Sequence, residues 1–215
     1  NTLPDGSQPV PFGMLAKATG KSAGMVTTAR ITHATPAGFA ANVPERAMEA
    51  VIAEQYLERG IDVLLGGGDE FFNPAKRKDG ADLYAMFRKQ GYGLARSRDE
   101  LAREGSTSSG RLLGVFSEGH VPYQIDRAHR PELKAAVPSL EEMIEAALNR
   151  LQSNSTGFVL QIEAGRVDHA GHQNDPASIL REQLEFDRAV ALVREFAETN
   201  GETLVVVTTD HGTGG

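Results

Sequence analysis

Short runs of apolar and β-branched residues alternate along this chain with longer segments whose apolar residues recur at helical spacing. The runs that we expect to form strands are 25–31, 61–65, 94–97, 112–116, 158–162 and 203–208. The segments that we expect to form helices are 11–19, 44–59, 82–90, 139–151 and 176–200. Strands that are apolar on both faces and alternate with helices indicate a largely parallel central sheet with helices on both faces. The pattern therefore predicts the α/β class.

Local signals set several boundaries of these elements. Pro44 is expected at the first position of its helix, and Ser139 with Glu142 forms a capping box that opens the next-to-last helix. Asn200-Gly201 should end the last helix. Its inward face is expected to carry seven apolar residues, namely Ile179, Leu180, Leu184, Ala189, Leu192, Val193 and Phe196.

Two stretches lack a clear period. Residues 104–110 read as a flexible surface loop, and residues 117–138, with three prolines, read as a long irregular excursion. The sequence contains no internal repeat and no linker. We therefore expect residues 1–215 to form a single domain.

Composition narrows the possible functions. The net charge of −7 disfavours a general nucleic-acid-binding module, which needs a basic face. No apolar run reaches the roughly 20 residues that cross a bilayer, and no signal peptide is recognisable in the sequence. With no cysteine, any metal must be held by carboxylate, imidazole, hydroxyl or carbonyl groups, a donor set that suits zinc and magnesium.

The candidate chemistry lies where predicted strands end. The run that starts at Phe158 leads into Glu163, Asp168, His169 and His172, and the run 203–208 leads into Asp210 and His211. Four of the six histidines lie in such strand-end segments, each with a carboxylate or hydroxyl nearby. Because α/β folds keep their sites at the carboxyl ends of strands, these segments suggest a metal cluster between two strand ends.

Each of these signals also has a structural interpretation. Asp168 and His172, four residues apart, can share one metal, but His172 can equally cap or solvate a loop. The Asp210-His211 pair can be an ordinary turn. Glu163 at the end of an apolar strand requires a cation, which a metal or Arg166 could supply.

Two further features are weighed in the same way. Gly66-Gly67-Gly68 lacks the Lys-Ser/Thr of a phosphate-binding loop and is interpreted as a tight strand exit without chemistry. Arg46 is either a solvated charge or a bidentate clamp on a phosphate group.

Five blocks, taken together and in order, resemble the alkaline phosphatase family. They are VTTARITHATPAGFAANVPER (26–46), DVLLGGGDEFF (62–72), GVFSEGHVPYQIDR (114–127), LQIEAGRVDHAGHQND (160–175) and VVVTTDHGTGG (205–215). The resemblance implies an alkaline-phosphatase-like three-layer α/β sandwich that is incomplete at both ends of this chain.

The resemblance also implies a role for each matched residue. Asp168 and His172 match ligands of a first zinc, Asp210 and His211 match ligands of a second zinc, and Glu163 and Thr35 match ligands of a magnesium ion. Arg46 matches the arginine that binds the substrate phosphate. His33 and His169 match positions that adjust the surroundings of the magnesium and the phosphate, with His169 on the substrate side.

The activity implied by the resemblance is hydrolysis of phosphate monoesters through a phosphoserine, assisted by two Zn²⁺ and one Mg²⁺. A homodimer and a periplasmic or extracellular location are implied as well. No serine of this chain lies in the family's nucleophile motif, and a third histidine ligand of the first zinc is expected beyond Gly215. We therefore expect a central fragment with little activity of its own.

Two other functions stay open at this point. A related two-metal hydrolase, such as a phosphodiesterase or a sulfatase-like enzyme, would use similar metal ligands. Arg46 and the His33–Ala37 segment argue against it because the resemblance places them in the monoesterase branch. A non-catalytic metal-binding fragment is favoured by the absence of the nucleophile.

Overall fold

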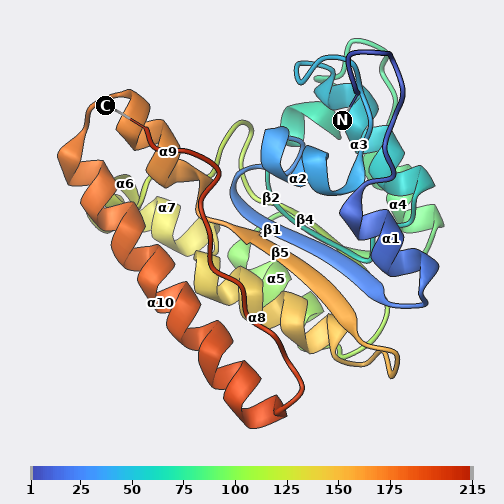
Figure 1. The fold of residues 1–215 in the computed structure, drawn as a ribbon. Coiled ribbons are helices and arrows are strands. Elements are labelled where there is room, and N and C mark those ends of the chain that lie inside the picture. The colour runs from blue at the N-terminus through green and yellow to red at the C-terminus, as the bar shows by residue number, and fades with distance from the viewer. Residues whose placement is uncertain (1, 214–215) are drawn as a thin grey trace.

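The computed structural model describes residues 2–213 and has a five-stranded sheet at its centre (Figure 1). The strand order is β3-β4-β2-β1-β5, and every neighbouring pair is parallel. The strands are β1 (Ser22–Arg30), β2 (Val63–Gly67), β3 (Tyr92–Ala95), β4 (Arg111–Val115) and β5 (Phe158–Glu163). Parallel strands need crossover connections, which the helices supply. The predicted parallel α/β fold is therefore confirmed.

Helices cover both faces of this sheet (Figure 1). The elements on one face are α1 (Phe12–Ala18), α2 (Ala34–Ala40), α3 (Glu49–Glu58), the short 3-10 helix η1 (Asp69–Phe71) and α4 (Leu83–Lys89). Those on the other face are α5 (Arg98–Gly105), α8 (Leu140–Leu151) and α10 (Pro176–Asn200). Neighbouring residues of β1 separate the two cores, because Met25 packs into the first and Val26 into the second. No helix in the described part of the chain is long and apolar enough to cross a membrane.

Several predicted boundaries are confirmed in detail. Ser139 and Glu142 form the reciprocal capping box at the start of α8. Gly201 follows α10 with a φ of 74°, a left-handed conformation that glycine adopts without steric cost. These helix ends were predictable because they depend only on residues close together in the sequence.

The prediction was wrong for three stretches between the main elements. Residues 44–48 are not helical, so Pro44 does not open α3. The start of the expected loop 104–110 belongs to α5, whose N-cap Ser97 accepts a hydrogen bond from the backbone N–H of Glu100. The expected irregular excursion contains α6 (Gln124–His129) and α7 (Pro131–Ala136). These helices are short and bury few apolar side chains, so they leave little periodicity to detect.

The inward face of α10 also differs from the prediction. Leu180 and Leu184 are 60% and 45% exposed, whereas Glu182 and Glu185 are buried. The backbone N–H groups of Gln124 and Leu140, at the starts of α6 and α8, donate to these two carboxylates at 2.6 and 3.0 Å. Unpaired N–H groups at helix starts therefore decide which side of this part of α10 faces inward.

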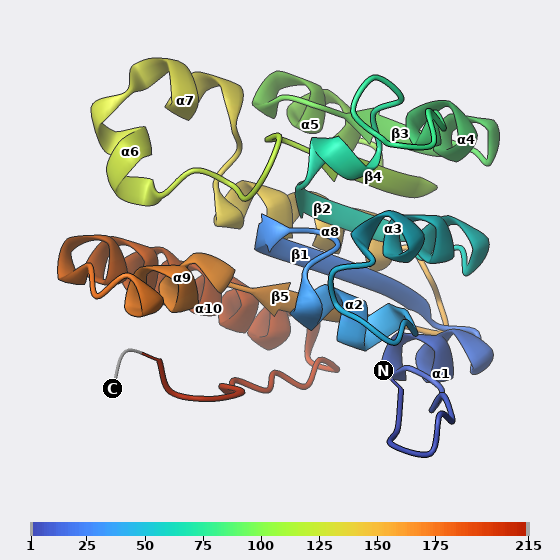
Figure 2. The same cartoon turned by 90° about the horizontal axis from the view of Figure 1, so that it is seen from above.

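The predicted strand 203–208 is absent from the described sheet. Residues 202–209 have no regular secondary structure, and Leu204 and Val206 are 86% and 74% exposed. Figure 2 shows the segment on the side of the edge strand β5 that faces away from β1. Apolar and β-branched composition alone does not make a strand, because a strand also needs a partner for its backbone.

Candidate functional site

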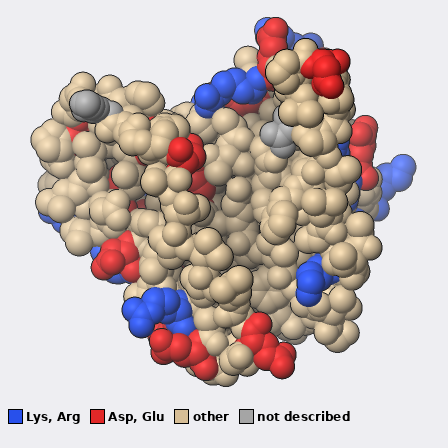
Figure 3. Space-filling model, in the orientation of Figure 1, with Lys and Arg blue, Asp and Glu red and all other residues tan. Residues whose placement is uncertain are grey.

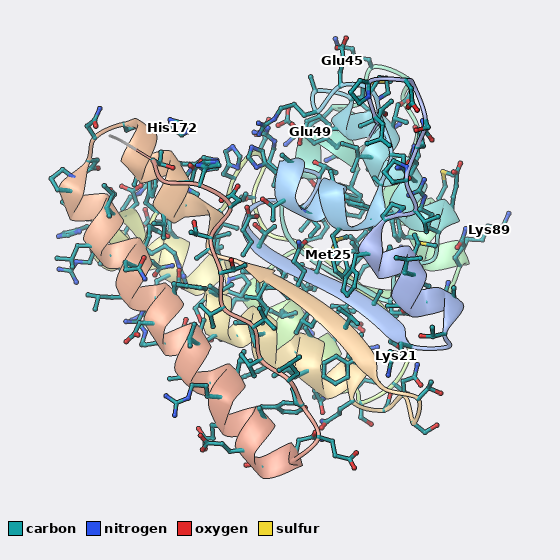
Figure 4. The ribbon with its side chains drawn as sticks, in the orientation of Figure 1. Lys21, Met25, Glu45, Glu49, Lys89 and His172 are labelled. Carbon is teal, nitrogen blue, oxygen red and sulfur yellow. The ribbon has the colours of Figure 1, made fainter. Side chains whose placement is uncertain are left out.

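The predicted site residues lie at the carboxyl ends of β1 and β5, which pair in parallel with Thr27 opposite Glu163. After β1 the chain turns into α2, which carries Thr35, and after β5 it turns into α9 (Gly165–His172). Figure 3 shows a hollow in the surface between the part of the molecule that carries α9 and the part that carries α2 and α3. His172 and Glu49, labelled in Figure 4, lie on opposite sides of this region.

Glu163 is the innermost carboxylate of the site. It accepts a hydrogen bond from the Thr27 hydroxyl at 2.6 Å and another from the Thr35 hydroxyl. Burial raises the pKa of Glu163, and the negative charges of Asp210 and Asp168 raise it further. Among the described residues neither Arg166 nor another base forms an ion pair with Glu163, so the ion-pair interpretation of this residue is not supported.

Asp168 and His172 lie one turn apart on α9, and Oδ1 of Asp168 is 3.5 Å from Nε2 of His172. The Thr213 hydroxyl donates to the same oxygen at 2.6 Å. Asp210 and His211 lie on the exposed segment that leads to Thr213, and their side chains contact each other at 3.3 Å. We name Glu163, Asp168 and Asp210, with Thr35, His172 and His211, the carboxylate zone.

The carboxylate zone suits a cation. Three carboxylates lie near one another, and within residues 2–213 no lysine or arginine forms an ion pair with any of them. The charge of a buried carboxylate is costly unless a cation compensates it. Oxygen donors with two imidazoles are the groups that magnesium and zinc accept from proteins. The residues present therefore offer the donor types that these metal ions accept, as the pairs Asp168–His172 and Asp210–His211 and the carboxylate of Glu163. Among the described residues, the one group of three candidate ligand atoms within 4.8 Å of one another is that of His33, His120 and His169.

Three imidazoles form a second group beside this zone. The ring centroids of His120 and His169 are 4.2 Å apart, and His33 lies 5.2 and 5.3 Å from them. One ring nitrogen from each histidine lies within 4.8 Å of the others. Each ring also contacts an arginine, so we name these three histidines with Arg30, Arg46 and Arg166 the His–Arg cluster.

The arginine contacts follow one pattern. Nη2 of Arg46 is 3.1 Å from Nε2 of His33, and Nη1 of Arg166 is 3.0 Å from Nδ1 of His169. Arg30 contacts both nitrogens of His120, through its backbone N–H at 3.1 Å and through Nη1 at 2.8 Å. Because an arginine only donates, it takes the acceptor nitrogen of His33 and of His169, whereas both nitrogens of His120 face donor groups of Arg30.

The three imidazoles are neutral at physiological pH. Burial lowers the pKa of His120 to about 3 and that of His169 to about 4. Nearby positive charges lower both values further, including His169 for His120 and Arg166 for His169. Burial followed by the charge of Arg46 lowers the pKa of His33.

His120 is the site residue that the sequence reasoning missed. It lies five residues after the end of β4, in a segment that we expected to be irregular. The approach of this segment depends on Gly67, where a Cβ atom would lie 2.1 Å from the carbonyl oxygen of Gly119. The sequence did contain a signal for this residue, because a histidine shortly after a parallel strand is expected at the same edge of the sheet as the other site residues.

Arg46 and His33 are brought together, and Glu163, Asp168, His169 and His172 lie at or after the end of β5. Asp210 and His211 instead follow a segment that is not a strand. Arg46 belongs to the non-helical stretch before α3 and is exposed. Its only side-chain hydrogen bond within the described part of the chain goes to His33. The Gly66–Gly68 turn contributes no side chain to the site, although Gly67 admits the loop that carries His120.

Fold and site together define a parallel α/β protein with a group of carboxylates and a group of imidazoles and arginines near the same edge of its sheet. The chain belongs to the alkaline phosphatase family, since the model of that family, described as alkaline phosphatase, matches residues 11–215. The repressible alkaline phosphatase of Saccharomyces cerevisiae is 40% identical over 93% of this chain and 39% of its own length. Alkaline phosphatase 3 of Bacillus subtilis is 36% identical over 98% of this chain and 44% of its own length.

Solved structures agree with this assignment. The alkaline phosphatase of Thermus thermophilus matches with a TM-score of 0.86 and 53% identity, over 91% of this chain and 40% of that one. A variant of the TAB5 alkaline phosphatase, 27% identical with a TM-score of 0.83 over 100% of this chain and 59% of that one, has magnesium bound in its M3 site. The chain thus spans about two fifths of the length of the first curated relatives it matches.

Proposed function

We propose that this chain forms the central part of a metal-dependent phosphomonoesterase that acts through a phosphoserine. The observation that carries the proposal is the closeness of two complementary regions, since the charge of Asp168 in the carboxylate zone acts on the pKa of both His33 and His169 in the His–Arg cluster. A phosphate monoester needs both, because its oxygens bind cations and its negative charge needs donors. Membership in the alkaline phosphatase family supports the same reaction.

In this proposal the carboxylate zone holds the metal ions. Asp168 with His172 and Asp210 with His211 would each hold a zinc ion, and Glu163 with Thr35 would hold magnesium. Such ions stabilise the charge on the attacking and leaving oxygens of an in-line displacement. The nucleophilic serine is proposed to lie outside residues 1–215, as are the remaining metal ligands.

The arginine and imidazole side chains would bind and orient the phosphate. Arg46 is exposed, carries no ion pair among the described residues, and can donate two parallel hydrogen bonds to phosphate oxygens. The acceptor nitrogen of His33 holds it near the site. His169, next in sequence to Asp168, would donate its remaining N–H from the other side.

The test is a calorimetric titration of inorganic phosphate onto the chain in the presence of Zn²⁺ and Mg²⁺. Arg46→Ala should weaken binding by roughly 1.5–3 kcal/mol, the scale of a hydrogen bond to a charged group. Arg194→Ala is the matched control, because Arg194 is exposed on α10 and pairs only with Glu198 among the described residues. Equal phosphate affinity in the two variants would contradict the proposed role of Arg46.

A second experiment distinguishes phosphomonoesterase activity from phosphodiesterase activity. Any hydrolysis by the chain or by the whole protein should be faster on p-nitrophenyl phosphate than on its bis-ester. The reverse order would favour the related two-metal phosphodiesterase. A homodimer and a periplasmic or extracellular location belong to the same proposal and rest on the family resemblance alone.

A further inference from the structure

Arg166 forms no ion pair with a carboxylate among residues 2–213, although the charges of Glu182 and Asp126 act on it from outside ion-pair distance. It is half-buried, its guanidinium lies 3.5 Å from the centroid of the Tyr123 ring, and its Nη1 contacts His169. Its Nε is buried without a hydrogen-bond partner. No carboxylate of residues 2–213 forms an ion pair with it, whereas Arg30 in the same cluster is compensated by Glu49 at 2.5 Å. The stacking on Tyr123 orients the guanidinium but leaves its charge in place.

The hydrogen-bond pattern of the His–Arg cluster decides which kind of ligand it can take. A metal ion needs a lone pair from each imidazole, but an arginine already occupies an acceptor nitrogen of each ring. Changing the tautomer would turn a ring N–H toward an arginine N–H. His33 and His169 therefore each present their remaining nitrogen as a donor, whereas both nitrogens of His120 face donor groups of Arg30. The part of the cluster formed by His33 and His169 thus suits a ligand that accepts hydrogen bonds and carries negative charge.

Two uncompensated guanidinium groups lie on either side of this donor surface. Arg46 contacts His33 and Arg166 contacts His169, and the two rings have centroids 5.3 Å apart. One phosphate bound at Arg46 compensates one of these charges. The second charge, at Arg166, has no ion-pair partner among the described residues and is therefore free to bind a further anionic group close to the first.

We propose that Arg166, oriented by Tyr123 and His169, binds a second anionic group of the substrate, so that the site prefers phosphate monoesters that carry a carboxylate or another phosphate near the ester. The inference rests on the proposed phosphate site at Arg46 and adds the substrate class. Arg166 is then a specificity-determining residue that contacts the leaving part of the substrate. It takes no part in the displacement at phosphorus.

The experiment compares two ligands that differ in one group. Phosphonoacetate carries a phosphonate and a carboxylate one carbon apart, and ethylphosphonate has a methyl group in place of the carboxylate. Binding of each is measured by calorimetry on the chain with Zn²⁺ and Mg²⁺ present. We expect phosphonoacetate to bind at least about tenfold more tightly, the effect of one charge-assisted interaction.

Substitutions of Arg166 test whether this residue causes the preference for phosphonoacetate over ethylphosphonate. Arg166→Gln should reduce the affinity ratio by roughly tenfold, Arg166→Lys should restore part of it, and Arg194→Gln should leave it unchanged. Any contribution of the carboxylate to chelating the metals persists in Arg166→Gln, so a ratio that survives this substitution overturns the inference.

The remaining outcomes separate this inference from the proposed function. Equal binding of the two ligands to the unaltered chain overturns the second anionic subsite and leaves the phosphate site at Arg46 standing. Binding of neither ligand overturns both. If His120→Asn removes one equivalent of bound Zn²⁺ that Asp168→Asn leaves in place, the cluster binds a cation and the inference is also overturned.

Discussion

The carboxylate zone and the His–Arg cluster lie at the same edge of the sheet, yet they are held in place differently. The cluster is braced, because Glu49 accepts from both Arg30 and the buried Thr32 hydroxyl, and Arg30 in turn holds His120. Of the three carboxylates in the carboxylate zone, only Glu163 has hydrogen-bond partners among the described residues that hold it in the protein interior. Glu163 is held by Thr27 and Thr35, whereas Asp210 and His211 lie on the exposed segment after α10.

The difference suggests that the two regions bind different kinds of ligand. A preformed donor surface binds an oxyanion without reorganisation, which makes its electrostatic contribution larger. Neighbouring carboxylates repel one another unless a cation compensates their charge, so under the proposed function we expect metal binding to stabilise the zone. Both properties follow from the partners that each side chain has within the described residues.

The largest expected effect comes from removing the brace of the cluster. Glu49→Ala leaves the guanidinium of Arg30 without its carboxylate in a largely buried place, which should lower the free energy of unfolding by roughly 3–5 kcal/mol. The change is measured by urea unfolding, with Glu58→Ala on the exposed side of α3 as the control. A loss no larger than that of the control would show that the cluster is not held by this pair.

The second-largest expected effect is a pH-dependent change in the free energy of unfolding, caused by the buried carboxyl group of Glu182 next to the cluster. Glu182 is 1% exposed, and burial together with the charge of Glu185 raises its pKa from 4.5 to about 7, although the charges of Arg166 and Arg127 lower it. A raised pKa means that stability present below pH 4.5 is lost as the pH rises through about 7. Glu182→Gln should therefore raise the free energy of unfolding by on the order of 2 kcal/mol at pH 8 and by little at pH 4.5.

Thermal unfolding at both pH values measures this difference. Glu195→Gln, at an exposed position of the same helix, is the control. An equal gain at both pH values would mean that ionisation of Glu182 is not the cause.

A smaller effect separates the two regions by their ligands. Glu163→Gln should weaken the binding of Mg²⁺ or Zn²⁺ by at least about tenfold, or roughly 1.4 kcal/mol, and should leave phosphonate binding at the cluster less affected. In the absence of metal the same variant should unfold at a higher temperature at neutral pH, because burial raises the pKa of this carboxyl. Metal titration by calorimetry measures the first effect, and Glu145→Gln on the exposed side of α8 is the control.

The smallest expected effect on stability is that of a substitution in the segment 203–208. Val206→Ser should change the stability by less than about 0.5 kcal/mol, because Val206 is exposed. Val26→Ala on β1, where the side chain is buried, should cost about 2 kcal/mol. Urea unfolding of both variants compares the two predicted strands, and a large effect of Val206→Ser would mean that the segment is packed.

Much of the fold was predictable because it depends on local signals. The five strands of the sheet and five of the helices were placed within a few residues, with the α8 capping box and the glycine after α10 assigned to the right positions. The four-residue spacing of Asp168 and His172 left a turn, a helical start and a loop open, and in the structure both residues lie on α9.

The remaining features depend on partners that are distant in the sequence. Glu182 and Glu185 face inward because two helix starts offer N–H groups, which hydrophobic spacing along α10 cannot reveal. His120 joins the site through the close approach of its loop to Gly67. The apolar run 203–208 matches a strand in composition, but pairing decides whether it becomes one.

The most direct test of the two-region account is a crystal structure of the chain with both zinc and phosphate, with data collected at the zinc absorption edge. The account predicts anomalous density beside Asp168 and His172 or beside Asp210 and His211, and phosphate within hydrogen-bond distance of Arg46. Zinc coordinated by His33, His120 and His169 would contradict it.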